Sequence, residues 1–141
     1  LAHELELPVI LHCVSAHGRM AQLLRARGKI EFGGMVHGFT GSWEVAQDYL
    51  SAGLSLSFGG LVTRPNSKKA HETAKRVPLE KLLIESDSPD HPASGWSGEQ
   101  SEPASLSLII QSLADLRGES AEVIGQATTD NARALFGLKP L

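Results

Sequence analysis

The chain contains the stretch Leu82-Leu83-Ile84-Glu85-Ser86-Asp87, a short apolar run that ends in acidic residues. Short apolar runs bounded by Gly, Pro or polar residues are typical of buried strands. Three further runs of this kind occur at residues 9–13, 35–39 and 54–58. We therefore predict four short buried strands.

Amphipathic segments separate these runs. The first ends at Gly28, the second begins after a predicted N-cap at Ser42 and ends at Gly53, and the third covers residues 66–77. An alternation of strands and helices predicts parallel βα units, so the fold class is α/β.

The remaining segments are predicted to be helical or loop. A helix is predicted over residues 1–7, and a loop rich in Pro, Gly and Ser covers residues 88–102. Two helices follow, over residues 103–117 and 120–136, the second with a break near Thr128. Because the chain opens inside a predicted helix, we expect an N-terminal part to be missing.

Two architectures accommodate four βα units: a small open sheet, or half of an eight-unit barrel. Parallel strands need both faces covered and their edges protected. A half barrel alone exposes two edges, so we expect either further sequence or a partner.

Composition restricts the function classes. The chain has 141 residues, of which 41% are hydrophobic and 21% are charged, and its net charge is −3. No global basic field is available for nonspecific binding of nucleic acid. One cysteine, Cys13, precludes an intrachain disulfide and fits a reducing compartment. Without a signal peptide or a membrane-length apolar run, we expect a cytoplasmic protein that does not bind membranes.

Three residues are candidate metal ligands: His12, His37 and Asp87. Each ends a predicted parallel strand, where α/β folds build their active sites. Imidazole and carboxylate groups bind catalytic zinc and similar ions, and Asp87 is the natural base for a metal-activated water. The alternative is that the histidines are structural.

Other polar residues receive weaker assignments. Glu85 precedes Asp87 by two, so both face the same side of the strand. Glu85 either hydrogen-bonds to a metal ligand and orients it, or is a buried charge paired with a cation. Cys13 is predicted to lie in the core, and His3, His17 and His71 on the surface.

Four segments resemble the TatD family of metal-dependent hydrolases, part of the amidohydrolase superfamily, several members of which are DNases. They are Leu7-Pro8-Val9-Ile10-Leu11-His12-Cys13, Val36-His37-Gly38-Phe39-Thr40-Gly41-Ser42, Leu82-Leu83-Ile84-Glu85-Ser86-Asp87-Ser88-Pro89 and Asn131-Ala132-Arg133-Ala134-Leu135-Phe136-Gly137. They occur in the family's order over nearly the whole chain. The pair Glu102-Pro103 also looks like the family pattern. We expect Glu102 to contact the metal-ligating residues and not the metal itself.

The resemblance implies a TIM-type (β/α)8 barrel, with residues 1–141 as a partial domain that supplies strands five to eight. It implies metal-ligand roles for His12, His37 and Asp87, and water activation by Asp87. The family's His-x-His and bridging Glu have no counterpart here, because they belong to the half that the chain lacks. Many members carry a basic residue where this chain has Val14, which puts one phosphate contact in doubt.

The resemblance therefore implies a metal-dependent hydrolase, a DNase in its full-length form, that uses one or two Zn, Mg or Mn ions. The expected partners are DNA and either the missing barrel half or a second copy of the chain. Two alternatives remain open. One is an inactive fragment that serves as a structural or interaction module, and the other is a hydrolase of small esters or amides.

Overall fold

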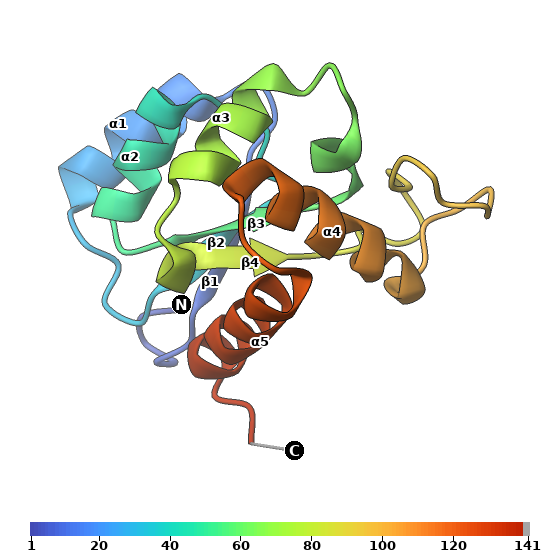
Figure 1. Cartoon of the computed structure of the whole chain (residues 1–141). Helices are drawn as coiled ribbons and strands as arrows, with labels where there is room; N and C mark the ends of the chain where they lie inside the picture. The colour runs from blue at the N-terminus through green and yellow to red at the C-terminus, as the bar shows by residue number, and fades with distance from the viewer. Residues whose placement is uncertain (140–141) are drawn as a thin grey trace.

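The computed structural model describes residues 1–139 and confirms the α/β class (Figure 1). The strands are β1 (Val9–His12), β2 (Gly34–His37), β3 (Ser55–Phe58) and β4 (Leu82–Ile84). The helices are α1 (His17–Arg27), α2 (Trp43–Ser51), α3 (Lys68–Arg76), α4 (Leu106–Arg117) and α5 (Ala121–Phe136). Short 3-10 turns cover η1 (Gly60–Thr63), η2 (Leu79–Lys81) and η3 (Pro103–Ser105).

The four strands form one parallel sheet in the order β1-β2-β3-β4. In its register, His12 is paired with His37 and Phe58 with Ile84. The carboxyl ends of the strands therefore meet at one edge of the sheet, where polar residues that follow the strands are brought together.

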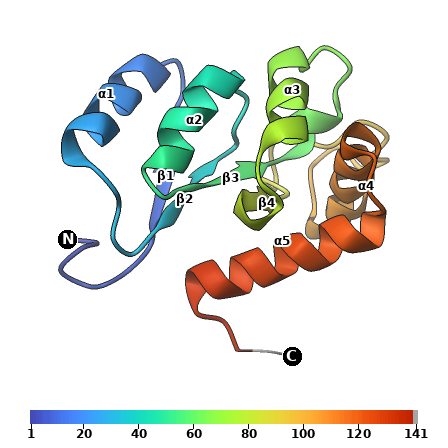
Figure 2. The same cartoon turned by 60° about the vertical axis from the view of Figure 1, so that its left-hand side comes forward.

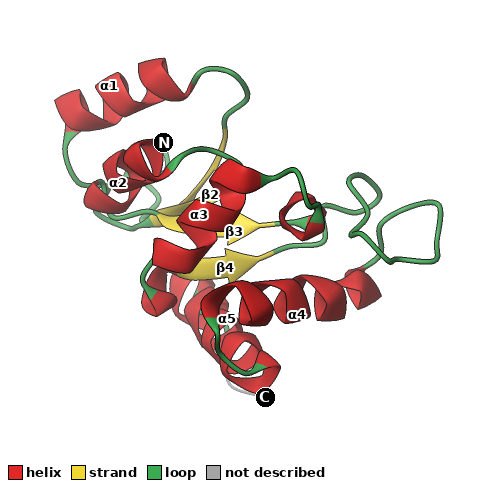
Figure 3. Cartoon of the chain, turned by 45° about the horizontal axis from the view of Figure 1, so that its top comes forward, coloured by secondary structure: helices red, strands yellow, loops and turns green. Residues whose placement is uncertain are grey.

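One face of the sheet carries the main core. The helices α1, α2 and α3 lie side by side over it, as Figures 2 and 3 show. Val36, Leu56 and Leu82 are fully buried beneath these helices, and Ile109 and Leu113 of α4 join the same cluster. These apolar side chains alternate along the strands with residues that face the other way, as expected for a sheet covered by helices.

The opposite face is only partly covered. Ile10, Met35 and Leu83 point to this side and lie outside the core cluster. The helix α5 packs against β4 and lies across the sheet from α1, α2 and α3 (Figure 2). Leu83 is only 3% exposed, whereas Ile10 on the β1 edge is 61% exposed. An apolar strand residue is thus open to solvent at the β1 edge.

Two predictions about helices are wrong. Residues 2–6 form turns instead of a helix, and the left-handed φ of 55° at Glu6 prevents helical geometry from continuing through this residue. The expected break near Thr128 is absent, and α5 is continuous. The Thr128 hydroxyl donates to the Ile124 carbonyl at 2.8 Å, which accommodates this buried residue within the helix.

Within residues 1–139, none of the helices combines the length and the apolar character needed to cross a membrane.

Asn131 ties α5 to the start of β4. Its side-chain Nδ2 donates to the carbonyls of Leu79 and Leu82, at 2.7 and 2.8 Å. These two carbonyls belong to the turn and strand that α5 packs against. A single amide thus satisfies two backbone acceptors that would otherwise lose partners at the helix–strand junction.

We expect Asn131→Ala to lower the free energy of unfolding by about 1–3 kcal/mol, because both carbonyls lose a half-buried donor. Urea denaturation followed by circular dichroism measures the change. Thr129→Ala, an exposed change on the same helix, is the control and should stay within about 0.5 kcal/mol of the parent. Equal stability of the Asn131 variant and the parent would contradict this role.

Candidate metal centre

His37 and Glu85 are in contact at the carboxyl edge of the sheet. The Nδ1 atom of His37, the last residue of β2, lies 2.8 Å from Oε1 of Glu85, which follows β4. The same oxygen accepts the backbone N–H of Gly38 at 2.7 Å. Gly38 has a left-handed φ of 57°, a conformation that glycine adopts without strain.

Asp87 lies on the other side of the His37 ring. Its Oδ1 atom is 3.4 Å from Nε2 of His37, and both side chains are half-buried. One ligand atom from each of His37, Glu85 and Asp87 lies within 4.8 Å of the other two. An imidazole with two carboxylates is a donor set that divalent cations accept.

Glu85 sets the protonation of the His37 ring. A carboxylate oxygen accepts hydrogen bonds, so Nδ1 carries the proton that it donates to Glu85. In the neutral ring, the lone pair is then on Nε2, the atom that faces Asp87. This arrangement fits a metal ion, because Nε2 and the Asp87 carboxylate both present lone pairs to the same space.

A second observation bears on the fit. The Oε2 atom of Glu85 is buried, and within residues 1–139 it has no hydrogen-bond partner. A buried carboxylate oxygen is costly without a donor or a cation. Because Glu85 contacts Nδ1 and Asp87 faces Nε2, the fit to a cation rests on the Nε2 and Asp87 side of the ring, and the Oε2 atom of Glu85 is left as an unsatisfied polar atom.

His12 contributes from the neighbouring strand. Its ring centroid is 5.4 Å from that of His37, with the planes tilted by 30°, and the register pairs these two residues on neighbouring strands. The side chain of His12 is exposed, and its nitrogens lie outside the compact group formed by the other three residues. Its role as a ligand stays a prediction.

An open cavity of about 530 Å³ connects these residues. His12, His37 and Asp87 line it together with His17 and Lys69. Such a cavity has the size of a small-molecule or nucleotide site. The three predicted ligands thus share one cavity wall, whereas Glu85 lies behind His37.

The loop after β4 is held against the sheet by specific contacts. The Ser101 hydroxyl donates to the Ser86 carbonyl at 2.7 Å. Gly60 of η1 packs closely against this loop, and a Cβ atom at position 60 would lie 2.0 Å from the His91 carbonyl oxygen. This approach brings His91 to the cavity wall, where it joins the lining beside Asp87.

Other predicted residues lie in different places. Glu102 is exposed at the start of η3, and it is not among the residues that line the cavity. Its supporting role stays a prediction. The core prediction for Cys13 is wrong, because this residue is partly exposed and lines the cavity. The surface predictions for His17 and His71 are also wrong, because both rings are half-buried and hydrogen-bonded.

Tyr49 is a component that the sequence did not reveal. This residue of α2 is fully buried, and its hydroxyl lies 2.8 Å from Nδ1 of His17. Burial raises the pKa of Tyr49, with the nearby Cys13 thiol as a further cause, so the phenol stays protonated. Helical spacing alone indicates a core tyrosine, and only the fold brings its hydroxyl next to a residue 32 positions away.

Comparisons with known proteins agree with this geometry. The family model "TatD related DNase" matches residues 1–137. The "Uncharacterized metal-dependent hydrolase YabD" of Bacillus subtilis is 38% identical over 96% of this chain and 53% of its own length. The "3'-5' ssDNA/RNA exonuclease TatD" of Pantoea sp. is 37% identical over 98% of this chain and 55% of its own length.

A solved structure extends the likeness to three dimensions. The crystal structure of YjjV, a TatD homologue from Escherichia coli K12, superposes with a TM-score of 0.89 and 34% sequence identity. The match covers 98% of this chain and 53% of that structure. The chain therefore spans about half the length of the relatives that it matches. On the family-model match over nearly its whole length, the chain belongs to the TatD-related DNase family.

Proposed function

We propose that this chain is the C-terminal half of a TIM-type barrel and supplies strands five to eight. The partly uncovered face of the sheet supports the proposal, because Ile10 is an apolar strand residue that is 61% exposed. The buried hydroxyl of Ser57 on the same face has no hydrogen-bond partner within residues 1–139. An N-terminal half barrel would cover this face and close the β1 edge.

The proposed function of the complete barrel is metal-dependent hydrolysis of phosphodiester bonds in DNA. The observation that carries it is the convergence of His37, Glu85 and Asp87 at the carboxyl edge of the sheet. The exonuclease name of the Pantoea relative supports DNA as the substrate class. Since the chain has no global basic field, contacts within the site would hold the DNA.

The residues of this chain have distinct proposed roles. His12, His37 and Asp87 would hold one or two divalent ions, and Zn, Mn and Mg all remain candidates for the metal. A bound ion lowers the pKa of its water and clamps phosphate oxygens. Asp87 would accept the proton of the attacking water. Glu85 keeps the proton of His37 on Nδ1 and thereby points the Nε2 lone pair into the site.

The sequence leaves two other functions open: an inactive structural module, and a hydrolase of small esters or amides. A structural module would not need two carboxylates close to both nitrogens of one histidine. The cavity would also admit a small ester, so the substrate assays below include one.

The experiments use a fused barrel, in which the part of YjjV outside the matched region is joined to the amino end of the chain at Leu1. We expect Asp87→Asn in this protein to lower DNA hydrolysis by orders of magnitude at saturating metal, because the amide is not basic and binds cations weakly. Release of nucleotides from a labelled single strand measures the rate. A small phosphodiester and a small carboxylic ester are assayed in parallel.

Asp90→Asn is the matched control, because Asp90 is exposed and three residues away. It should retain the parent rate. Near-normal hydrolysis by the Asp87 variant would remove Asp87 from the mechanism. A parent protein that cleaves the carboxylic ester and neither phosphodiester would overturn the proposed substrate class.

Glu85→Gln tests the orienting role of the carboxylate. The Gly38 N–H would hold the amide oxygen where it still accepts from Nδ1, but the amide carries no charge and makes His37 a weaker ligand, so metal affinity of the fused barrel should fall about 10–100-fold. Competition with a fluorescent chelator measures the affinity. Glu72→Gln, an exposed change on α3, is the control. Unchanged affinity in the Glu85 variant would show that His37 does not depend on this contact.

The chain of residues 1–141 alone should be inactive on DNA and should self-associate. It lacks the metal ligands of the other half, and its β1 edge and Ile10 are exposed. Size-exclusion chromatography with light scattering, and the DNA assay with and without divalent metal, measure both properties. A stable monomer with metal-dependent cleavage would contradict the half-barrel proposal.

A further inference from the structure

His17 is a polar group of the cavity to which the proposed mechanism assigns no role. It is the first residue of α1 and lines the cavity shared with His12, His37 and Asp87. Its ring makes edge-to-face contacts with Phe39 and Tyr49, at centroid distances of 5.9 and 6.0 Å. A half-buried ring with this packing has few alternative rotamers, so it is held in place before any substrate arrives.

The hydrogen bond to Tyr49 sets which ring nitrogen is protonated. The Tyr49 hydroxyl is fully buried, and its proton needs an acceptor. Nδ1 of His17, at 2.8 Å, is a good acceptor, whereas the Cys13 sulfur beside the hydroxyl is a weak one. Burial also lowers the pKa of His17, which favours the neutral ring. Tyr49 therefore donates to Nδ1, and the proton of the imidazole is on Nε2.

The Nε2–H group is then a donor available to the cavity. Within residues 1–139 the ring's hydrogen bond is made by Nδ1, and Nε2 is not among the buried atoms that lack a partner. A fixed neutral N–H donor that lines the same cavity as the candidate metal ligands is suited to a non-bridging phosphate oxygen. The nearby position 14 carries the uncharged side chain of Val14, so it provides no competing cation.

We propose that His17 binds a phosphate oxygen of the substrate through Nε2–H, and that Tyr49 is the positioning residue that fixes this donor. The proposal rests on the proposed function, since it names how the same site recognises a phosphodiester. It assigns a substrate contact to α1 that does not pass through the metal. The donor would act on the phosphate group and not on the base, so the contact is independent of sequence.

Substitutions in the fused barrel test the kinetic consequence. We expect His17→Leu to lower kcat/KM on single-stranded DNA about 10–100-fold, mainly through KM. His17→Gln should recover part of the loss, because its amide can also donate. Tyr49→Phe keeps the buried ring but removes the hydroxyl, and its effect should be much smaller in the His17→Leu background than in the parent. Additive effects of these two changes would overturn the coupling between them.

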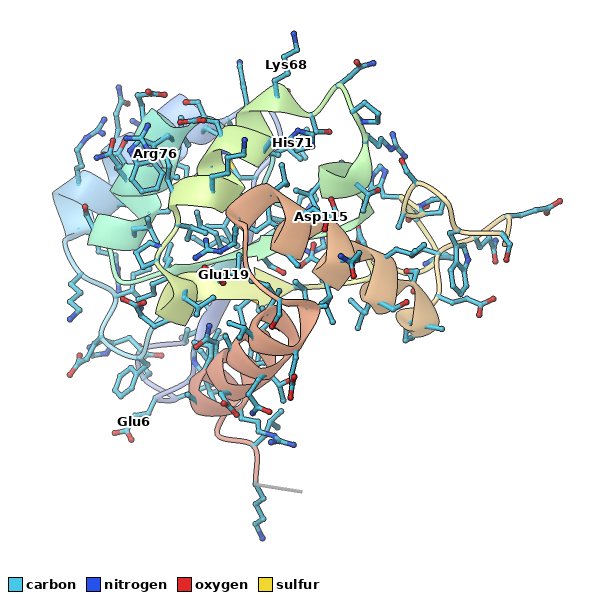
Figure 4. The ribbon with its side chains drawn as sticks, viewed as in Figure 1. Glu6, Lys68, His71, Arg76, Asp115 and Glu119 are labelled. Atoms are coloured by element: carbon cyan, nitrogen blue, oxygen red, sulfur yellow. The ribbon has the colours of Figure 1, made fainter. Side chains whose placement is uncertain are left out.

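His71 supplies a matched control. It is also half-buried, and its ring nitrogen Nε2 lies 2.8 Å from the Val62 carbonyl. However, His71 lines a separate groove between α3 and α4, together with Asp115 (Figure 4). His71→Leu should leave the KM for DNA unchanged. A loss of similar size in both histidine variants would indicate a general packing effect and would overturn the proposal.

A binding measurement separates this proposal from the proposed function. Nitrogen NMR of the histidine rings in the fused barrel should show the proton of His17 on Nε2, and thymidine 5'-phosphate should shift that signal and leave the His71 signal unchanged. A proton on Nδ1, or no shift at saturation, would overturn the role of His17. If the nucleotide shifts the signal but no phosphodiester is cleaved, the proposed activity fails while the phosphate contact stands.

Each fused variant is first compared with its parent by near-ultraviolet circular dichroism. Where the YjjV fusion does not give a folded parent, the corresponding part of YabD replaces the YjjV part, and the same variants are measured in that fusion. The NMR readout needs no turnover, so either folded parent decides whether His17 meets the phosphate.

Discussion

The register of the four parallel strands is the constraint on which the site depends. Pairing of His12 with His37 and of Phe58 with Ile84 fixes where each strand ends. His37 at the end of β2 then contacts Glu85 and Asp87 after β4, across the end of β3, although these residues are far apart in the sequence. A shift of one residue in the pairing of β2 with β3 would turn His37 to the opposite face of the sheet from Glu85 and Asp87.

The two faces of this sheet differ in what covers them. The face toward α1, α2 and α3 is covered by helices of the same chain, and its residues Val36, Leu56 and Leu82 are fully buried. The other face combines apolar Ile10 with buried polar atoms of Ser57 and Glu85 that have no partner within the described residues. Such a mixture is unfavourable on an isolated sheet and ordinary in the interior of a closed barrel.

The sequence was sufficient for the strands and for the meeting of His37 with Asp87. Apolar runs with Gly and Pro at their ends mark the strands, and parallel topology then brings the carboxyl ends together. It was not sufficient for residues 1–7, where helical composition was outweighed by a left-handed residue at Glu6. Nor could it reveal the contact of Tyr49 with His17, because that contact depends on how α1 and α2 pack.

Two histidines in the cavity show how a partner on Nδ1 determines the chemistry of Nε2. Glu85 can only accept, so His37 keeps its proton on Nδ1 and offers a lone pair on Nε2, as a metal ligand requires. Tyr49 has a proton to donate, so His17 accepts on Nδ1 and offers an N–H on Nε2, as an anion requires. Under the two proposals, the same kind of side chain would therefore bind a cation in one place and a phosphate in another. The difference arises from the residues that contact Nδ1, Glu85 after β4 and Tyr49 on α2, and not from the histidines themselves.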